Sequence, residues 1–392
     1  MRQSRPDVTP RTPADLRPNR LARARAAQPP RHDLTASNPT RCGIPYPPDL
    51  LAPLADPRGL VYRPEPRGLP AARRAAAGEL ARHGAAVDPS RIVLTASTSE
   101  AYAFLLKLLC RPGDEVLVPT PSYPLFEQLA RVEAVTARPY RLDADSGWRL
   151  DLHELAQTPE AVRAVIVVHP NNPTGSFVHP ADADALEALC ARRGWALIAD
   201  EVFLDYPLDG GAGSGATFAA RRRALTFTLG GLSKSVGLPQ LKLAWIAASG
   251  PRRLVGPALE RLDYVADTFL SVATPVQLAL PALLRRGAAT RRAILARCRA
   301  NLRTLRTLAR RLPAVEVPPV GGGWSAVLRY PAVIGEEELA LDLLRRDGVA
   351  VHPGYFFDFP RDGVLVLSLL PEPASFRAGV VRLFARLERA LR

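Results

Sequence analysis

The chain has 392 residues, 47% of them hydrophobic, and carries a formal net charge of +14. That length can bury a large core, and it favours two or three domains or one large α/β unit with a smaller partner. No apolar run approaches the roughly 20 residues of a membrane helix, and the basic N-terminus lacks the apolar core of a secretory signal, so we expect a cytoplasmic protein.

Arginine supplies nearly all of the positive charge, because only three of the 52 cationic residues are lysines. A basic chain raises nucleic acid as a partner. Here the arginines are spread along the chain, and no basic block alternates with aromatics, so we expect no specific nucleic-acid partner. The spacing of the four cysteines predicts buried thiols and no metal site: Cys42, Cys110, Cys190 and Cys298.

Residues 1–30 are rich in proline and arginine and show little apolar periodicity. They predict a flexible N-terminal arm with at most a short helix around Leu21. A helix is expected over residues 70–83, ending at Gly84.

Apolar strand-like runs then alternate with helical segments. Strands separated by helices predict a mostly parallel sheet covered on both faces. Seven such runs occur, at residues 91–96, 115–119, 134–139, 164–169, 196–199, 225–229 and 243–248. After Gly250 the pattern changes to long helices over 252–266 and 275–312, and then to a mixture of strands and helices that predicts a separate α+β lobe.

Four loops follow predicted strands, where ligands of such sheets bind. The loop at 95–101 is rich in small hydroxyl residues and runs into a helix, which suits either a phosphate seat or an ordinary N-cap. The loop at 119–124 holds Tyr123 between prolines, so that its ring could stack on a cofactor or pack in the core.

The other two loops carry an amide and a carboxylate. Asn172 lies between a buried strand and Pro-Thr-Gly, where its amide can donate to a ligand oxygen. Asp200 and Glu201 end an apolar run, and a carboxylate at the end of a buried strand is costly unless it meets a cation.

Lys234 stands in the stretch Leu-Ser-Lys-Ser-Val-Gly-Leu-Pro, after a predicted buried strand and a glycine turn. In a chain that uses arginine almost everywhere else, charge alone does not explain a lysine. An amine can lose its proton near neutral pH and form a Schiff base, which a guanidinium cannot.

Together these loops resemble the aspartate-aminotransferase-like superfamily of fold type I pyridoxal-phosphate enzymes, from about Asp33 to the C-terminus. The motifs that carry the likeness are Asn-Asn-Pro-Thr-Gly, Asp-Glu-Val, Ser-Lys-x-x-Gly-Leu-Pro and the run from Pro112 to Pro124. The resemblance implies a three-layer α/β sandwich with a mostly parallel seven-stranded sheet plus a smaller α+β domain. It places the large domain, which binds pyridoxal 5′-phosphate, at 45–270 and the small domain at 31–44 and 271–392.

The resemblance also implies roles for single residues. Lys234 matches the Schiff-base lysine, and Asp200 matches the aspartate that keeps the cofactor's ring nitrogen protonated. Asn172 matches the donor to the ring hydroxyl oxygen, and Tyr123 the aromatic that stacks on the ring. The residues matched to the phosphate are Thr98, Ser99, Ser233, Lys242 and Tyr62, the last reaching the neighbouring subunit of a homodimer.

This sequence departs from the family at three informative positions. Phe203 replaces a frequent tyrosine that also bonds the ring hydroxyl oxygen, and Lys242 replaces a common arginine. Val366 stands where the family usually has the arginine that clamps the substrate carboxylate. Arg41 and Arg361 have the right charge to replace that clamp, although a solvated surface arginine is the commoner interpretation of each, and Asn38 is a further candidate at the substrate.

The resemblance predicts an aminotransferase that moves an amino group between an α-amino acid and a 2-oxo acid by a ping-pong mechanism, with Lys234 as proton shuttle. A pyridoxal-phosphate lyase or decarboxylase is the nearest alternative, because it shares the Lys and Asp chemistry. A non-catalytic, cofactor-binding regulatory protein is a third, although residues 1–32 are too short and proline-rich for a helix-turn-helix.

Overall fold

A large mixed sheet organises the first two thirds of the computed structural model, which describes residues 11–13, 15–209, 216–270 and 272–391. Its strands lie in the order β2 (Ile92–Thr95), β9 (Ala244–Ser249), β8 (Thr226–Gly231), β7 (Ala196–Asp200), β6 (Val162–Val168), β3 (Glu115–Thr120), β4 (Thr136–Asp143) and β5 (Arg149–Leu150). Only β9 and β5 run against their neighbours. All seven expected strands are therefore present, and the two-residue β5 adds an eighth at one edge.

Side chains alternate between the two faces of this sheet, as the period of a strand requires. In β6, Ile166 packs into the core on one face, and its neighbours Val165 and Val167 pack into the core on the other. The first face is covered by α3 (Thr98–Leu109), α4 (Phe126–Val132) and α8 (Arg252–Phe269). The opposite face is covered by α2 (Pro70–Arg82), α5 (Leu152–Ala156), α6 (Pro180–Arg193) and the first half of α9 (Thr274–Ala309). The predicted three-layer α/β sandwich is thus confirmed.

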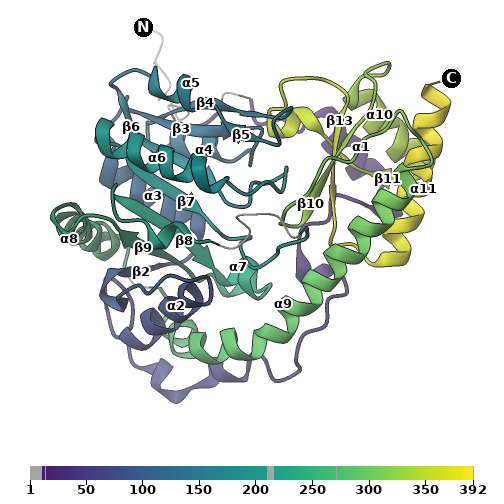
Figure 1. Ribbon diagram of the computed structural model, residues 1–392. Coiled ribbons are helices and arrows are strands. Elements are labelled where there is room, and N and C mark those ends of the chain that lie inside the picture. Colours follow the sequence, from purple (N-terminus) through teal and green to yellow (C-terminus); the bar gives the residue numbers. More distant parts are fainter. Residues whose placement is uncertain (1–10, 14, 210–215, 271, 392) are drawn as a thin grey trace, which may run out of the picture.

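Helix α9 links this sandwich to a second lobe, into which its C-terminal half runs (Figure 1). There β10 (Ser325–Arg329), β13 (Val364–Ser368) and β12 (His352–Pro353) form an antiparallel sheet, and β1 (His32–Asp33) pairs with β11 (Val349–Ala350). Helices α10 (Glu336–Asp342) and α11 (Pro373–Ala390) pack on this lobe. The lobe therefore combines the C-terminal third with a strand from the N-terminal part of the chain.

The described part of the expected arm contains a short helix where the sequence suggested one. Residues Arg20–Ala27 form helix α1, near the expected position of Leu21. Arg20 lies 2.7 Å from Glu337 of α10, and the side-chain amide of Gln28 donates to the carbonyl of Leu344 at 3.3 Å. This end of the arm is therefore docked on the second lobe, while residues 1–10 and 14 lie outside the described residues.

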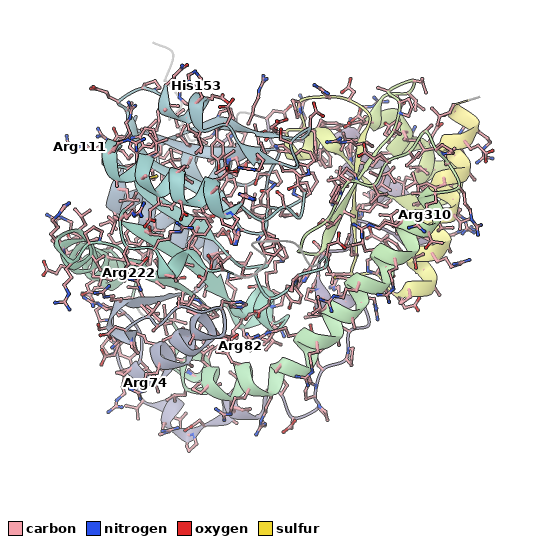
Figure 2. All side chains as sticks on the ribbon, viewed as in Figure 1. Arg74, Arg82, Arg111, His153, Arg222 and Arg310 are labelled. Carbon is pink, nitrogen blue, oxygen red and sulfur yellow. The ribbon has the colours of Figure 1, made fainter. Side chains whose placement is uncertain are left out.

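Exposed arginines project from widely separated elements, as Arg74, Arg111, Arg222 and Arg310 do in Figure 2. Within the described ranges, no single helix is both long and apolar enough to cross a membrane. The bent pair α8 and α9 meets that test jointly, by length and composition alone.

Candidate active site

The site lies where the carboxyl ends of β7 and β8, the first turn of α3 and the antiparallel sheet of the second lobe meet. They enclose a cavity of about 190 Å³. Its lining is Ser37, Thr98, Ser99, Tyr102, Tyr123, Leu129, Val168, Asn172, Asp200, Val202, Phe203, Gly231, Ser233, Lys234, Trp324, Ser325 and Ser368. The structure thus brings eight of the predicted site residues together around one space.

Asp200, the last residue of β7, is a buried carboxylate in this lining. Its Oδ2 accepts a hydrogen bond from the Tyr102 hydroxyl at 3.0 Å, and its Oδ1 accepts one from the backbone N–H of Val202 at 3.1 Å. Burial raises the pKa of Asp200, against the opposing effects of these two bonds and of the nearby Lys234 charge. Among the described residues no cationic side chain lies within 4.0 Å of this carboxylate.

Lys234 reaches the same cavity from α7 (Leu232–Ser235), the single turn of helix that follows β8. Its amine lies 4.8 Å from the centroid of a Trp324 ring and 5.5 Å from that of the Phe203 ring. Burial lowers the pKa of Lys234 to about 8, and the charge of Asp200 opposes that shift. A lysine in such a setting is in part an unprotonated amine near neutral pH, which is the form that acts as a nucleophile or base.

The first turn of α3 offers an anion seat at another side of the cavity. Ser97 caps the helix, since its hydroxyl oxygen accepts the N–H of Glu100 at 3.1 Å. Thr98 and Ser99 follow it and line the cavity together with Ser233. Free N–H groups and hydroxyls at a helix N-terminus bind phosphate groups well.

The two asparagines of Asn-Asn-Pro-Thr-Gly have different surroundings. Asn171 is buried and does not line the cavity: its Oδ1 accepts from Ser122 at 2.9 Å, and its Nδ2 donates to Pro121 and Thr174. Asn172 lines the cavity, and among the described residues its Oδ1 has one long contact of 3.4 Å, to the hydroxyl of Ser325. Asn171 thus fixes the loop, which leaves the amide of Asn172 available to a ligand.

The two aromatic positions expected from the sequence also line the cavity. Tyr123 is 40% exposed and packs edge-on against Phe126, with ring centroids 6.2 Å apart. Phe203 is buried against Trp324. The side chain of Phe203 carries no hydroxyl, so this position donates no hydrogen bond to a ligand.

Three residues expected at the substrate do not line the cavity of this single chain, and their roles stay predictions. The side-chain oxygen of Asn38 accepts from the N–H and hydroxyl of Thr40, and Ser37 takes its place in the lining. Arg41 ends a short 3-10 helix and is itself exposed. Arg361, with a side chain 82% exposed, lines a different cleft and lies 3.8 Å from Asp145.

The two remaining phosphate candidates also lie outside the lining of this single chain. Lys242 is exposed, eight residues beyond Lys234, in a left-handed backbone conformation with φ of 49°. Tyr62 is 66% exposed, as a residue that serves a neighbouring subunit would be in an isolated chain. Their expected contacts with the phosphate stay predictions.

Sequence reasoning missed five polar or aromatic lining residues: Ser37, Tyr102, Trp324, Ser325 and Ser368. Tyr102 could have been found, because it lies four residues after Thr98 and therefore on the same face of α3. Ser325 and Ser368 face each other across β10 and β13, and together with Trp324 they enter the site through the docking of the second lobe. No local pattern in the sequence signals that docking.

The residues present fit pyridoxal 5′-phosphate. The buried Asp200 lacks a cationic partner among the described side chains, and a protonated ring nitrogen would supply one. The amine of Lys234 lies in the same cavity for the aldehyde carbon, and the first turn of α3 offers N–H groups and hydroxyls for the phosphate. Fold and site together therefore define a fold type I pyridoxal-phosphate enzyme.

Comparison with known families identifies the class more closely. The model of the family "Aminotransferase class I and II" matches residues 51–377. The chain belongs to this family, and it is a pyridoxal-phosphate-dependent aminotransferase that moves an amino group between an amino acid and a 2-oxo acid.

Individual relatives are similar at moderate identity. An alanine aminotransferase of Mycobacterium tuberculosis is 28% identical over 304 residues, covering 76% of this chain and 70% of the relative. An arginine–pyruvate transaminase of Pseudomonas aeruginosa is 30% identical over 299 residues, covering 74% and 72%. The structure of tyrosine aminotransferase from Leishmania infantum superposes with a TM-score of 0.83 at 20% identity, covering 96% of this chain and 99% of that one, which shows a shared fold.

Proposed function

We propose that Lys234 and Asp200 carry the amino-group transfer. The observation that supports this best is the composition of the cavity: among the described residues that line it, these two alone carry a formal charge. Their opposite charges and shared burial suit a cofactor that needs an amine at its reactive carbon and a carboxylate at its ring nitrogen.

The other lining residues would hold the cofactor in place. Asn172 would bond the ring hydroxyl oxygen, and Tyr123 would lie against the ring. Thr98, Ser99 and Ser233 would hold the phosphate, which Lys242 and the partner's Tyr62 would complete. Phe203 would pack beside the ring without donating a hydrogen bond.

The bound cofactor supplies an electron sink that stabilises negative charge on the substrate carbon that loses a proton. Lys234 then does the acid–base work: its amine accepts the proton from the substrate α-carbon and later returns one at a different position. A pKa near 8 suits both halves of this task, because neither form of the amine is scarce near neutral pH. Asp200 would keep the ring nitrogen of the bound cofactor protonated, and the hydrogen bonds that it accepts from Tyr102 and Val202 hold its carboxylate in position.

The experiment that tests this assignment is a half-reaction on the cofactor-loaded enzyme. Each amino acid would be added alone, and then a 2-oxo acid, while the visible absorbance of the cofactor is followed. An aminotransferase loses that absorbance with the amino donor and regains it with the acceptor. A lyase or decarboxylase would turn over amino acid with no need for an acceptor, and a regulatory protein would do neither.

The substrate carboxylate must be held differently from the family's usual way. Val366 is 1% exposed in β13, two residues before Ser368 and so on the same face of that strand. We propose that hydroxyls at this end of the cavity, from Ser37 and Ser325, take part in binding it. The amino-acid screen described above can be repeated with the Ser325→Ala variant. If the Ser325 hydroxyl helps to bind the carboxylate, KM for the amino acid should be higher in this variant than in wild type.

We further propose a cytoplasmic homodimer in which residues 45–270 form the cofactor domain and residues 31–44 and 271–392 the smaller domain. Several large apolar side chains are exposed in the segment around Tyr62 and on α8, among them Leu60 and Tyr264. Arg67 joins the two regions through its ion pair with Asp263 at 2.5 Å. A shared apolar surface of this kind is suited to a subunit interface.

A further inference from the structure

The helix that carries Lys234 is too short to hold itself in place. Helix α7 spans only Leu232–Ser235, so the carbonyls of its last turn have no partners within the helix. Two side chains from other elements donate hydrogen bonds to two of these carbonyls. The Tyr206 hydroxyl donates to the carbonyl of Lys234, and the Nε of Arg291 donates to the carbonyl of Ser235 at 2.6 Å.

Arg291 comes from α9, which packs directly against α7, as Figure 1 also shows. One turn earlier on the same face of α9 lies Gly287. A Cβ at Gly287 would lie 2.6 Å from the Cβ of Val236, the C-cap residue directly after α7. Only glycine allows this approach, so α9 brings Arg291 to the end of α7 at close range.

The cation of Arg291 is compensated by a buried network rather than by solvent. Arg291 is 7% exposed, donates to Glu79 of α2 and lies 3.5 Å from Asp205. Arg82, labelled in Figure 2, bridges the same two carboxylates at 2.8 and 2.9 Å. Burial would raise the pKa of Asp205, but the bond from His83 and the charges of Arg291 and Arg82 bring it below its ordinary value.

Tyr206 is equally fixed. It is fully buried, and its ring lies 5.1 Å from that of Trp324, which in turn faces the amine of Lys234. The turn that follows α7 is held as well, since the Tyr46 hydroxyl donates to the carbonyl of Gly237 at 2.7 Å. The backbone of Lys234 is therefore held from α9, from the loop after β7 and from the N-terminal part of the chain.

We propose that Arg291 and Tyr206 are positioning residues, which fix α7 so that the amine of Lys234 meets the reacting atoms. They touch neither the cavity nor substrate and act only through the backbone of residues 234 and 235. A misplacement of a catalytic group by about 1 Å can cost ~100-fold in rate. We call Arg291 and Tyr206 the two anchors. Loss of either anchor should therefore lower kcat and leave KM nearly unchanged. The inference rests on the proposed role of Lys234.

The test compares each anchor with a matched control. Arg297 lies on the same helix and also donates to backbone carbonyls, those of Cys42 and Leu370, but not to α7. Tyr140 is a buried tyrosine whose hydroxyl donates to the carbonyl of Ile166 at 2.8 Å. Kinetics of Arg291→Met and Arg297→Met form one pair, and Tyr206→Phe and Tyr140→Phe form the other.

We expect kcat to fall about 10- to 100-fold in Arg291→Met and about 3- to 10-fold in Tyr206→Phe, with KM within about threefold and both controls near wild type. The pH midpoint of the cofactor's visible absorbance should shift only in the two anchor variants. In the cofactor-free protein, the pH midpoint for reductive methylation of Lys234 should shift in the same variants.

Equal losses in anchor and control variants, or a fall in kcat with unmoved midpoints, would overturn the proposal. If Arg291→Met does not fold, Tyr206→Phe decides, because it removes one hydroxyl and little volume. Should Lys234→Ala itself keep full activity, the proposed function fails as well, and the two failures are thereby told apart.

Discussion

At the scale of single residues, the environment of Lys234 sets its reactivity. Burial lowers its pKa to about 8, whereas the Asp200 charge acts to raise it. In the cofactor-free protein, Lys234 should therefore react with a methylating reagent with a midpoint near pH 8. Asp200→Asn should lower that midpoint further, since it removes the charge that favours the ammonium. With three lysines in the chain, peptide mass spectrometry resolves each one, and a midpoint near the ordinary ~10.4 would contradict this account.

The bond from Tyr102 to Asp200 leads to a second prediction. A hydrogen bond to a charged group contributes about 1.5–3 kcal/mol, and this one favours the carboxylate form. Tyr102→Phe should raise the pKa of Asp200 and weaken cofactor binding by about 10- to 100-fold. Equilibrium titration with pyridoxal phosphate measures the change, with Tyr140→Phe as the control. Unaltered affinity would mean that Tyr102 does not support Asp200.

At the scale of elements, Glu201 ties the end of β7 to the segment that leads into β8. Its two carboxyl oxygens accept from the Thr217 hydroxyl and the backbone N–H of Phe218, both at 2.6 Å. Burial raises its pKa to about 8. The second carboxyl of the Asp-Glu-Val motif thus fastens the chain and does not line the cavity.

This raised pKa makes stability depend on pH. Between about pH 4.5 and 8 the unfolded chain releases the Glu201 proton while the folded chain keeps it, so this group's contribution to stability is lost as pH rises. The loss in the free energy of unfolding is on the order of 4 kcal/mol, and a Glu201→Gln variant should not show it. The stability of this variant relative to wild type should therefore increase as pH rises across this window. Urea unfolding of both proteins from pH 5 to 8.5 measures it, and parallel curves would refute the expectation.

Elements with a strong local signal could be predicted from the sequence. Strands such as β6 and β7 contain buried apolar runs, and α9 shows helical periodicity over almost its full length, expected at 275–312 and found at Thr274–Ala309. Strand β5 has two residues, too few for any period to appear. Helix α1 is only partly explained by its own sequence, since its place depends on contacts with α10 that lie more than 300 residues away.

The same division holds for the site. Asp200 ends β7, Lys234 lies in the short helix after β8, and Asn172 lies in the loop after β6, so local sequence locates all three. Trp324, Ser325 and Ser368 enter the cavity because two lobes dock, and the two candidate arginines, Arg41 and Arg361, are exposed in this chain. Charge alone could not distinguish a ligand-binding arginine from a solvated one in a chain this rich in arginine.

At the scale of the whole molecule, subunit association can be tested through the exposed apolar surface. Leu60 is 89% exposed and Tyr264 78% exposed. Sedimentation should give twice the 42.4 kDa chain mass for wild type. Leu60→Glu should shift the protein toward the single-chain mass, because a buried charge at an interface is costly. An exposed control, Val333→Glu on the second lobe, should leave the mass unchanged. A wild-type protein of single-chain mass would contradict the proposed dimer.

The most direct test of the whole account is chemical. Cofactor-loaded enzyme is reduced with borohydride, digested and analysed by peptide mass spectrometry. We predict one phosphopyridoxyl adduct, on Lys234, with Lys107 and Lys242 unmodified. A protein that takes up no cofactor, or an adduct on either of the other lysines, would contradict the claim that Lys234 and Asp200 form a pyridoxal-phosphate site.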